Sequence, residues 1–369
     1  MDSATNAQND EDRWDVEYWR RREMRVGVIT GVKEARVLEY DLPVALPDQV
    51  LIKNKICLIC TTDYQQWMGL RPHQPIPMAF GHESAGIVEA TGCNVLHVKE
   101  GDLVACNGYR PCMVCESCKS GKNSSYCQNS PIKDFKCDEY GLYGLYACSE
   151  YQLVDAKHVY KLKPGTAFET AAFCEPVSTV IHGLNRLRVK PGERVLVIGA
   201  GMMGLINAEV ARFFGADVII SELSDKKLEM AAAMGFSKLI DVRTDDINVR
   251  VSELTDGHPV DAIIIAVGVT AAYKQAFEVA QMGCRLLIFA GGYPPPSWDT
   301  DPNRVHYQMT EIIGTYGCSP ADFQRAADLL GEKKINLDKL IEGRYPLDNV
   351  QKAFEKAASG DAYRYAVML

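Results

Sequence analysis

Four cysteines with close spacing form the densest group of metal-binding side chains in the sequence. They occur in the pattern Cys112-x2-Cys115-x2-Cys118-x8-Cys127. Four thiolates in one short loop suit a tetrahedral Zn²⁺ ion, and a closed set of four ligands leaves no position for a substrate. The pattern therefore predicts a structural zinc site. An iron–sulfur cluster, a redox switch and four coincidental core cysteines are weaker alternatives, the last because the polar loop between them could not bury them.

A second group of metal-binding residue types is dispersed along the chain. Cys60 ends an apolar run, His82 stands in the stretch Phe-Gly-His-Glu, and Glu175 is followed by proline. One cysteine, one histidine and one carboxylate with an open position make a catalytic zinc set, in which zinc acts as a Lewis acid and lowers the pKa of a bound alcohol or water. Each residue alone has an ordinary structural explanation, so the prediction depends on their combination.

A glycine-rich turn indicates a dinucleotide site. Gly199, Gly201 and Gly204 form GxGxxG directly after the apolar run Arg194–Ile198 and at the start of a helical pattern. The first glycine permits the tight turn. The second lets the backbone approach a pyrophosphate at the helix N-terminus, and the third lets helix and strand pack closely. Strand, motif and helix together give the context that this fingerprint requires.

The residue type at the end of the next strand predicts which dinucleotide binds. Glu222 follows Gly201 by 21 residues and ends the second apolar run. A carboxylate there accepts hydrogen bonds from both ribose hydroxyls and repels a 2′-phosphate, so NAD is favoured over NADP. The neighbouring Lys226 and Lys227 moderate this prediction.

The elements that must position these residues follow two patterns. Up to about residue 170 the chain alternates in short strand-like runs: Met24–Thr30, Val50–Cys57, Ser84–Ala90, Leu103–Cys106 and Glu150–Val154. Buried strands then alternate with helical patterns: strands Val195–Ile198, Val218–Ser221, Ala262–Val267 and Leu286–Phe289, helices Met202–Phe214 and Asp225–Met234. Such alternation predicts a parallel sheet. The chain ends with helical patterns at Ala321–Leu330 and Leu347–Ala358 and a strand at Tyr365–Leu369.

Composition excludes several classes of protein. The 369 residues suffice for two or three domains, and 47% hydrophobic with 24% charged residues is ordinary for a globular protein. The net charge of −8 gives no overall attraction to nucleic acid or anionic lipid. No apolar run approaches the roughly 20 residues of a membrane helix. Residues 1–23 are acidic without an apolar core, unlike an export signal, so we expect a cytoplasmic protein with an N-terminal extension.

Taken together, these motifs resemble the zinc-containing medium-chain dehydrogenase/reductase family of alcohol, sorbitol and threonine dehydrogenases. The resemblance covers about residues 24–369 and includes Gly81-His-Glu83, the four-cysteine lobe, the glycine loop and Asn303–Tyr307. It implies an α/β protein with a GroES-like β-rich catalytic domain (24–171 and 319–369) and a Rossmann NAD-binding domain (172–318). It also implies two zinc ions per chain and a homodimer or homotetramer.

The resemblance assigns roles to individual residues. Cys60 and His82 match zinc ligands, and Glu175 matches the glutamate ligand of the sorbitol-dehydrogenase-like branch. Glu83 matches an acidic residue that either ligates the metal or lies just behind it, and Thr62 matches the hydroxyl that receives the substrate proton. The cofactor contacts implied, besides the three glycines and Glu222, are Thr179, Met202, Met203, Lys227, Val267, Gly268 and Val269.

Two departures from the family pattern affect these assignments. Relatives often carry a histidine five residues after the first cysteine ligand, where this chain has Gln65, so the usual outer proton relay is in question. If Thr62 is not the proton acceptor, His73 and His306 are the next candidates. The last gap of the cysteine lobe holds eight residues where relatives usually have seven, an insertion that a turn can absorb.

These features predict an NAD- and zinc-dependent dehydrogenase that oxidises a secondary alcohol of a polyol, sugar alcohol or cyclitol to a ketone. The alternatives are a threonine or amino-alcohol dehydrogenase and, from another class, a cofactor-binding relative without activity. Retention of Cys60, Thr62, His82 and Glu175 argues against the inactive relative. The substrate itself depends on loops whose geometry the sequence does not define.

Overall fold

The structure, a computed structural model, describes residues 22–130, 136–292, 294–298, 300–360 and 362–369. Of the expected N-terminal extension, residues 1–21 lie outside the described residues. The chain divides into two compact units. Unit 1 comprises residues 1–108, 132–164 and 343–369, and unit 2 comprises residues 109–131 and 165–342. The units group residues by packing and divide the chain differently from the expected domains at 109–131, 165–171 and 319–342, so the domain boundaries stay a prediction.

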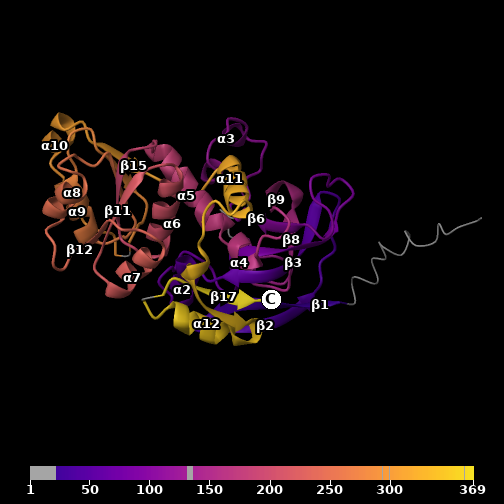
Figure 1. The fold of residues 1–369 in the computed structure, drawn as a ribbon. Coiled ribbons are helices and arrows are strands. Elements are labelled where there is room, and N and C mark those ends of the chain that lie inside the picture. The colour runs from indigo at the N-terminus through magenta and orange to yellow at the C-terminus, as the bar shows by residue number, and fades with distance from the viewer. Residues whose placement is uncertain (1–21, 131–135, 293, 299, 361) are drawn as a thin grey trace, which may run out of the picture. The chain divides into compact units, whose positions relative to one another are not determined.

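Unit 1 is built on two β-sheets (Figure 1). The smaller sheet has the strand order β2-β1-β4-β7, formed by Glu34–Asp41, Glu23–Gly31, Met78–Ala79 and Tyr143–Gly144. The larger has the order β16-β17-β3-β5-β6-β9, formed by Ile341–Pro346, Arg364–Met368, Gln49–Leu58, Glu83–Thr91, Leu103–Cys106 and Val159–Lys161. Strand β8 (Tyr151–Asp155) also pairs with β3.

The described residues of unit 1 also form the α-helices α2 (Thr61–Trp67) and α12 (Val350–Ala357) and the short 3₁₀ helices η4 (Ala156–His158) and η6 (Leu347–Asn349). Helices α2 and α12 pack together because Trp67 of α2 stacks on Phe354 of α12, with ring centroids 5.6 Å apart. Phe354 also meets Phe80 edge-on at 4.7 Å, directly before the glycine that precedes His82. This aromatic core holds the end of α2, the helix that begins after Cys60, and the approach to β5.

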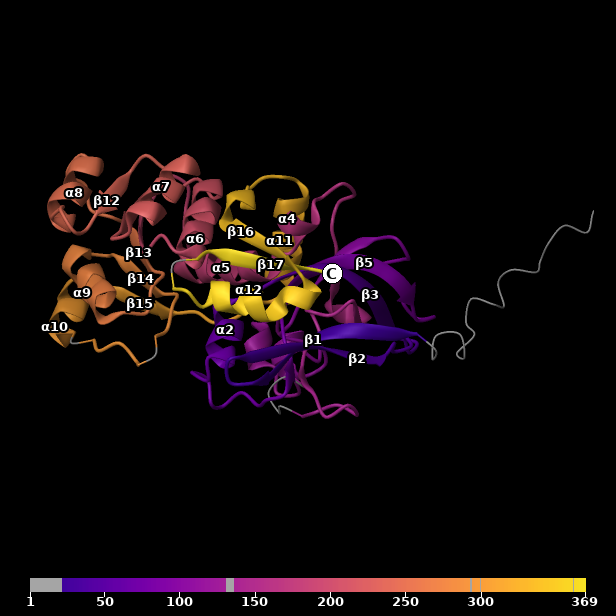
Figure 2. The ribbon, with the colours of Figure 1, turned by 90° about the horizontal axis from the view of Figure 1, so that it is seen from below.

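Unit 2 contains a six-stranded parallel sheet with the order β12-β11-β10-β13-β14-β15. Its strands are Leu239–Asp241, Asp217–Glu222, Arg194–Ile198, Ala262–Ile265, Arg285–Ile288 and Glu311–Gly314. Helices α5 (Cys174–Leu187), α6 (Met202–Phe213) and α7 (Asp225–Ala233) cover one face, and α8 (Ile247–Leu254) and α9 (Thr270–Val279) cover the other (Figures 1 and 2). Strand order reverses between β10 and β13, and ligands bind at the carboxyl ends of strands at such a point.

The other helices among the described residues of unit 2 are α3 (Glu116–Lys119), η2 (Ser124–Tyr126), α4 (Phe168–Ala171), α10 (Pro302–Tyr307), α11 (Pro320–Gly331) and η5 (Asp338–Leu340). Helix α11 joins α5 through Asp322, whose carboxylate lies 2.8 Å from His182 Nδ1 and accepts a 2.9 Å hydrogen bond from Asn185 Nδ2. This contact explains why residues 320–331 group with the parallel sheet.

The α/β fold expected from the sequence is confirmed, with a β-rich unit and a doubly wound parallel sheet. Every strand-like run named from the sequence coincides with a strand to within one or two residues. Seven strands among the described residues were not anticipated from the sequence: β2, β4, β7, β9, β12, β15 and β16. Strand β15 shows why, because three of its four residues are exposed and its sequence carries no apolar run.

Candidate functional site

The four lobe cysteines are brought together in unit 2. The Sγ atoms of Cys112, Cys115, Cys118 and Cys127 all lie within 4.8 Å of one another. Cys115 and Cys118 are separated by 3.5 Å, and Cys112 and Cys118 by 3.9 Å. All thirteen cysteines of the chain are free thiols, so no disulfide competes for these sulfurs. The donor set fits the closed four-sulfur zinc site predicted from the spacing.

Backbone amides in this lobe donate hydrogen bonds that stabilise the thiolate form of the cysteines. The amides of Val114 and Cys115 donate to Cys112 Sγ at 3.5 and 3.3 Å, and the amide of Cys112 donates to Cys127 Sγ at 3.2 Å. These backbone hydrogen bonds lower the pKa of Cys112 to about 6, whereas burial and then the hydrogen bond that Cys118 shares with Cys115 raise the pKa of Cys118 to about 12. A dication bound by the four sulfurs would favour the thiolate form of every one of them, so this donor set fits a metal site.

The lobe is tied to the segment after β15. Asn123 Nδ2 donates to the carbonyl of Tyr316 at 2.8 Å, and the amide of Ser124 donates to the carbonyl of Cys318 at 2.9 Å. Gly317 between them is required by packing, since a Cβ there would lie 2.5 Å from Ser125 Oγ. The cysteine lobe is thus a docked part of unit 2.

The dispersed residues of unit 1 also converge. The ligand atoms of Cys60, His82 and Glu83 lie within 4.8 Å of one another. Strands β3 and β5 pair in antiparallel fashion with Leu58 opposite Glu83. Cys60 follows the end of β3 by two residues and His82 precedes β5 by one, so the strand register carries both to the same end of the sheet. A thiolate and an imidazole there suit zinc.

A glycine makes this convergence possible. Gly81 has φ +96°, and a Cβ on it would lie 2.6 Å from Cys57 Sγ. Residues other than glycine rarely adopt this left-handed conformation, and the buried thiol leaves no room for a side chain. The Gly-His pair therefore turns the backbone so that His82 faces Cys60.

Arg364 is a member of this site that sequence reasoning missed. Its Nε and Nη2 donate to the two oxygens of Glu83 at 2.8 and 2.7 Å, and Nη2 lies 3.5 Å from Cys60 Sγ. Both side chains are at most 2% exposed. Burial opposes the guanidinium charge, but Glu83 and the Cys60 thiolate outweigh it and raise the pKa of Arg364. No sequence signal could have paired positions 281 residues apart.

Asp63 is a second residue whose role was not anticipated. Its Oδ2 accepts a 2.8 Å hydrogen bond from the Cys60 amide, and its Oδ1 lies 3.5 Å from His82 Nδ1. Burial lowers the pKa of His82, but the charges of Asp63 and Cys60 outweigh burial and hold that pKa well above its usual value. An acidic residue three positions after a helix N-cap is a sequence signal that could have identified the first contact.

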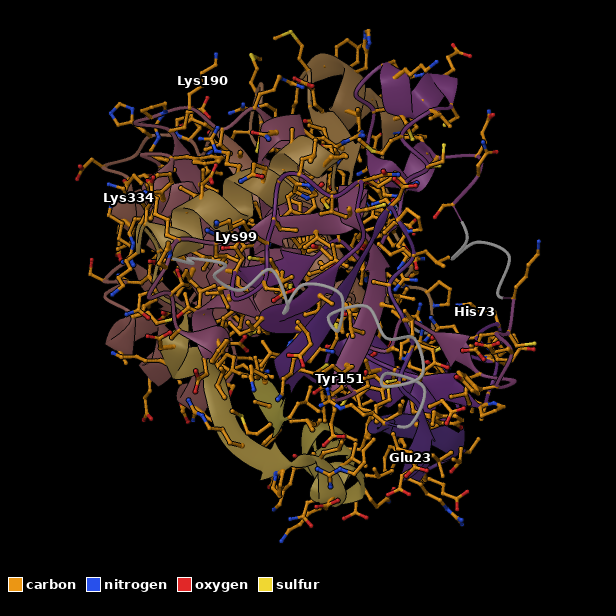
Figure 3. All side chains as sticks on the ribbon, turned by 90° about the vertical axis from the view of Figure 1, so that its right-hand side faces the viewer. Glu23, His73, Lys99, Tyr151, Lys190 and Lys334 are labelled. Carbon is orange, nitrogen blue, oxygen red and sulfur yellow. The ribbon has the colours of Figure 1, made fainter. Side chains whose placement is uncertain are left out.

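Thr62 lies beside this group, as its assigned role requires. Its Oγ1 is 3.5 Å from His82 Nε2. Gln65 lies on the same helix α2, and no imidazole occupies its position. Among the fallback candidates, His73 is exposed and projects into solvent (Figure 3), and His306 lies on α10 in unit 2. Thr62 is thus the hydroxyl next to the candidate metal ligands.

Glu175 belongs to unit 2, near the start of α5, and its role as a zinc ligand stays a prediction. Its backbone carbonyl accepts a 2.6 Å hydrogen bond from Ser178 Oγ. Thr179, one turn later, donates to the carbonyl of Pro176 at 2.9 Å. Both are bonds from a side-chain hydroxyl to the carbonyl three residues earlier, which serine and threonine make within helices.

The glycine loop has the geometry of a pyrophosphate cradle. Gly199 has φ +98°, and a Cβ on Gly204 would lie 1.8 Å from the Gly199 carbonyl oxygen, so loop and helix α6 touch directly. A Cβ on Gly201, by contrast, would meet nothing within 4 Å. Gly201 is the N-cap of α6 and Met202 its first residue, with Met203 next. Open space at a helix N-terminus is where a pyrophosphate binds.

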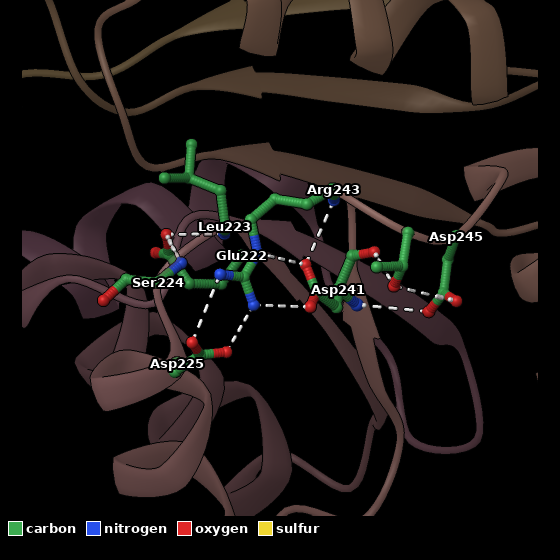
Figure 4. A network of polar contacts seen from close by, with 8 residues as sticks. Glu222, Leu223, Ser224, Asp225, Asp241, Arg243 and Asp245 are labelled. Atoms are coloured by element: carbon green, nitrogen blue, oxygen red, sulfur yellow. Dashed lines mark hydrogen bonds and ion pairs between the residues drawn. The ribbon is translucent and has the colours of Figure 1, made fainter.

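Glu222 lies next to this loop at the carboxyl end of β11. Its Oε2 accepts from the Ala200 amide at 2.8 Å, and its Oε1 accepts from the amides of Leu223 and Ser224 at 2.7 and 3.1 Å (Figure 4). The side chain is buried, and three amides fix its orientation. Lys226 instead pairs with Glu342 at 2.9 Å, and Lys227 lies on α7.

The stretch Val267–Val269 follows β13 on the same edge of the sheet. Gly268 is packed against another glycine pair, since a Cβ on it would lie 2.1 Å from the Gly291 carbonyl oxygen. Val269 is 49% exposed and forms the N-cap of α9. A Cβ on Gly199 would lie 3.2 Å from Val267 Cγ1, so this stretch begins beside the glycine loop.

Comparisons with known proteins place this geometry in a family. Residues 46–164 match the family described as alcohol dehydrogenase GroES-like domain, and residues 203–332 match the family described as zinc-binding dehydrogenase. Sorbitol dehydrogenase from Ovis aries is 30% identical over 90% of this chain and 93% of its own length. The chain belongs to the zinc-containing medium-chain dehydrogenase/reductase family.

Other similar proteins agree with this family. L-Galactonate-5-dehydrogenase from Escherichia coli is 28% identical over 90% of this chain and 95% of its own length. A zinc-binding dehydrogenase from Sinorhizobium meliloti, solved with NADP bound, is 25% identical, with a TM-score of 0.83 over 95% of this chain and 100% of that one. The family member described here is therefore an oxidoreductase that uses a nicotinamide cofactor and zinc to act on a small-molecule alcohol. No helix among its described residues has the length and apolar character to cross a membrane.

Proposed function

We propose that this dehydrogenase oxidises a secondary alcohol of a polyol, sugar alcohol or cyclitol to a ketone, with NAD as hydride acceptor and two zinc ions per chain. The observation that carries the proposal is the convergence of Cys60, His82 and Thr62 at one end of the β3–β5 pair. Relatives named for polyhydroxylated substrates, such as sorbitol and L-galactonate, support the substrate class. We infer a cytoplasmic homodimer or homotetramer.

Cys60 and His82 would hold the catalytic zinc, with Glu175 as a further ligand, and the lobe cysteines would hold the structural zinc. When bound, zinc would supply Lewis acidity toward the alcohol oxygen and NAD would accept the hydride. Asp63 orients His82 through Nδ1, which leaves Nε2 toward Thr62. A carboxylate that holds one imidazole nitrogen in this way fixes the ring for ligation by the other.

Glu83 acts from behind the metal ligands in this proposal. Both of its oxygens accept hydrogen bonds from Arg364, so the carboxylate is held in a bidentate ion pair. Arg364 also reaches Cys60 Sγ and stabilises the thiolate form of that ligand. The pair would thus tune the charge at the site, because an unpaired Glu83 would add a full negative charge beside Cys60.

Thr62 would accept the proton of the substrate hydroxyl and pass it outward through the ribose hydroxyl and ordered water. Gln65 can orient a water molecule, but its amide does not titrate near neutral pH. The pH dependence of turnover should therefore show no separate histidine beyond the ligand sphere. Glu222, oriented by three amides, would accept hydrogen bonds from the ribose hydroxyls and repel a 2′-phosphate.

A substrate screen tests the proposal. Polyols, inositols and amino alcohols are offered with NAD and with NADP, and absorbance of the reduced cofactor is followed while zinc per chain is measured. We expect NAD reduction with a polyol or cyclitol and a zinc content near two. Turnover only with threonine or another amino alcohol would contradict the substrate class, and equal use of NADP would contradict the cofactor assignment. One zinc without turnover would favour the inactive relative.

A further inference from the structure

A second charged group lies beside Glu222 at the carboxyl edge of the parallel sheet. Arg243 follows β12, which pairs with β11 so that Glu222 lies opposite Asp241. The amide that follows this pair continues the contact, because Val242 donates to the Glu222 carbonyl at 3.2 Å. Figure 4 shows the Arg243 side chain extending past Glu222 toward the start of α7.

Two aspartates hold the Arg243 guanidinium. Its Nε and Nη2 donate to the two oxygens of Asp241 at 2.9 and 2.7 Å, and its Nη1 and Nη2 donate to Asp225, the former at 3.2 Å. All three guanidinium nitrogens are thus engaged by carboxylates. Hydrogen bonds from the Arg243 side chain and amide lower the pKa of Asp241 to about 2, so both partners are charged at neutral pH.

The position and the net charge of this arrangement affect which nucleotide can bind. Ser224, whose amide donates to Glu222, directly precedes Asp225, so the guanidinium is bound next to the carboxylate expected to receive the ribose. An arginine near this position is the group that accommodates a 2′-phosphate in NADP-binding proteins of this fold. Here two carboxylates for one guanidinium leave the group with a net negative charge.

We propose that the Asp225–Arg243–Asp241 clamp is a second determinant of cofactor specificity, which withholds Arg243 from a 2′-phosphate and so favours NAD. The proposal rests on the NAD preference proposed above and adds residues to it. Removing Glu222 alone would then relax discrimination only in part, since Arg243 would stay bound to its two aspartates. Releasing one edge of the guanidinium would let it donate to phosphate oxygens, which arginine binds strongly in paired hydrogen bonds.

Asp225 is the appropriate residue to change. Its side chain is 73% exposed, compared with 23% for Asp241. Asp241 also accepts from the Arg243 amide at 3.0 Å and so shapes the turn itself. The test compares Glu222→Ser with Glu222→Ser/Asp225→Asn by titrating NADH and NADPH and following fluorescence of the reduced nicotinamide. Binding of reduced cofactor needs no alcohol, so the result does not depend on the substrate proposal.

We expect the added Asp225→Asn change to tighten NADPH binding by about 10- to 100-fold, the value of one or two charge-assisted hydrogen bonds. The effect on NADH should be small by comparison. Adding Arg243→Gln to this double variant should abolish the gain. Asp245→Asn in the Glu222→Ser background is the matched control, because it removes one charge from the same edge without contacting the guanidinium.

Two results would overturn the proposal by reducing the effect to net charge. One is a gain in NADPH affinity of the same size from Asp245→Asn, and the other is a gain that survives Arg243→Gln. No gain from Asp225→Asn, while the unmodified protein still prefers NADH, would reject the clamp and leave the NAD proposal intact. Equal binding of NADH and NADPH by the unmodified protein would reject both. Asp241→Asn provides a second route to release Arg243 if Asp225→Asn fails to fold.

Discussion

The cysteine lobe and the Cys60–His82 cluster both gather metal-binding side chains, but they do so by different physical means. In the lobe, sixteen consecutive residues, Cys112 to Cys127, supply all four sulfurs, and the local backbone supplies the amides that stabilise them. In the cluster, residues from β5, the start of α2 and the last strand meet, and a buried ion pair balances the charge. Local spacing builds the first site, and strand register builds the second.

This contrast implies different sensitivities. A substitution in the lobe should act locally, because its ligands share one loop. A substitution in the cluster should affect stability and chemistry together, because Glu83 and Arg364 also join β5 to β17. The predictions below run from the largest expected effect to the smallest.

The chemical role of the cluster is sharpened by Thr62→Ala. We expect turnover to fall by about 10²–10⁴-fold, the range of general acid–base steps, with little change in NAD affinity. Steady-state kinetics and NADH titration check this. Thr61→Ala changes the neighbouring hydroxyl and should stay active. Nearly full activity in Thr62→Ala would assign the proton to another group.

Gln65→His should add a second ionisation to the pH profile of turnover.

Breaking the buried ion pair should destabilise the cluster. Arg364→Met leaves Glu83 buried and unpaired, and we expect a loss of about 3–5 kcal/mol in unfolding free energy. One zinc ion should be lost while the lobe keeps its own. Denaturant unfolding and zinc analysis measure both effects. Glu83→Leu combined with Arg364→Met removes both charges and should recover much of the stability. A single variant as stable as the parent would show that the ion pair contributes nothing.

Cys115→Ser tests whether the cysteine lobe binds its own zinc ion. It removes one thiolate, so we expect loss of the lobe zinc with retention of the other ion, and a lower melting temperature, because a structural zinc contributes directly to folding. Metal analysis and calorimetry report the two outcomes. Cys93→Ser, at an exposed cysteine outside the lobe, is the control. Two retained ions with unchanged melting would reject the four-sulfur site.

Asp322 joins two helices that are far apart in the sequence, because its carboxylate contacts His182 and Asn185 of α5. Burial opposes its charge, but His182 and Ser319 outweigh burial and lower its pKa. Because the pKa is lower in the folded than in the unfolded chain, this contribution is complete above about pH 4 and is lost as pH falls through the folded pKa. Asp322→Asn should cost about 1–2 kcal/mol at pH 7 and less in acid.

Melting temperatures measured from pH 7 down to pH 3 check this dependence. Asp328→Asn, on the exposed side of the same helix, should change little at any pH. A deficit of Asp322→Asn that stayed constant across the range would mean that the charge of Asp322 is not the cause.

The sequence by itself determined what depends on near neighbours. The cysteine spacing, the glycine loop and the strands that alternate with helices are patterns within a few turns or strands of the chain, and they predicted the α/β fold and the family. His82 and Cys60 were named as ligands from residue type and resemblance. Even the helix start at Cys60 is local, because Asp63 contacts the Cys60 amide three residues away.

Only the tertiary structure decided which charges meet. The pairing of Arg364 with Glu83 follows from the neighbouring positions of β17, β3 and β5 in one sheet. The binding of Arg243 by Asp225 and Asp241 likewise follows from the parallel register of β11 and β12. Sequence periodicity reports which face of an element is buried, but it carries no information about which distant side chain lies opposite. Strand order and register supply that information, and with it the electrostatics of both candidate sites.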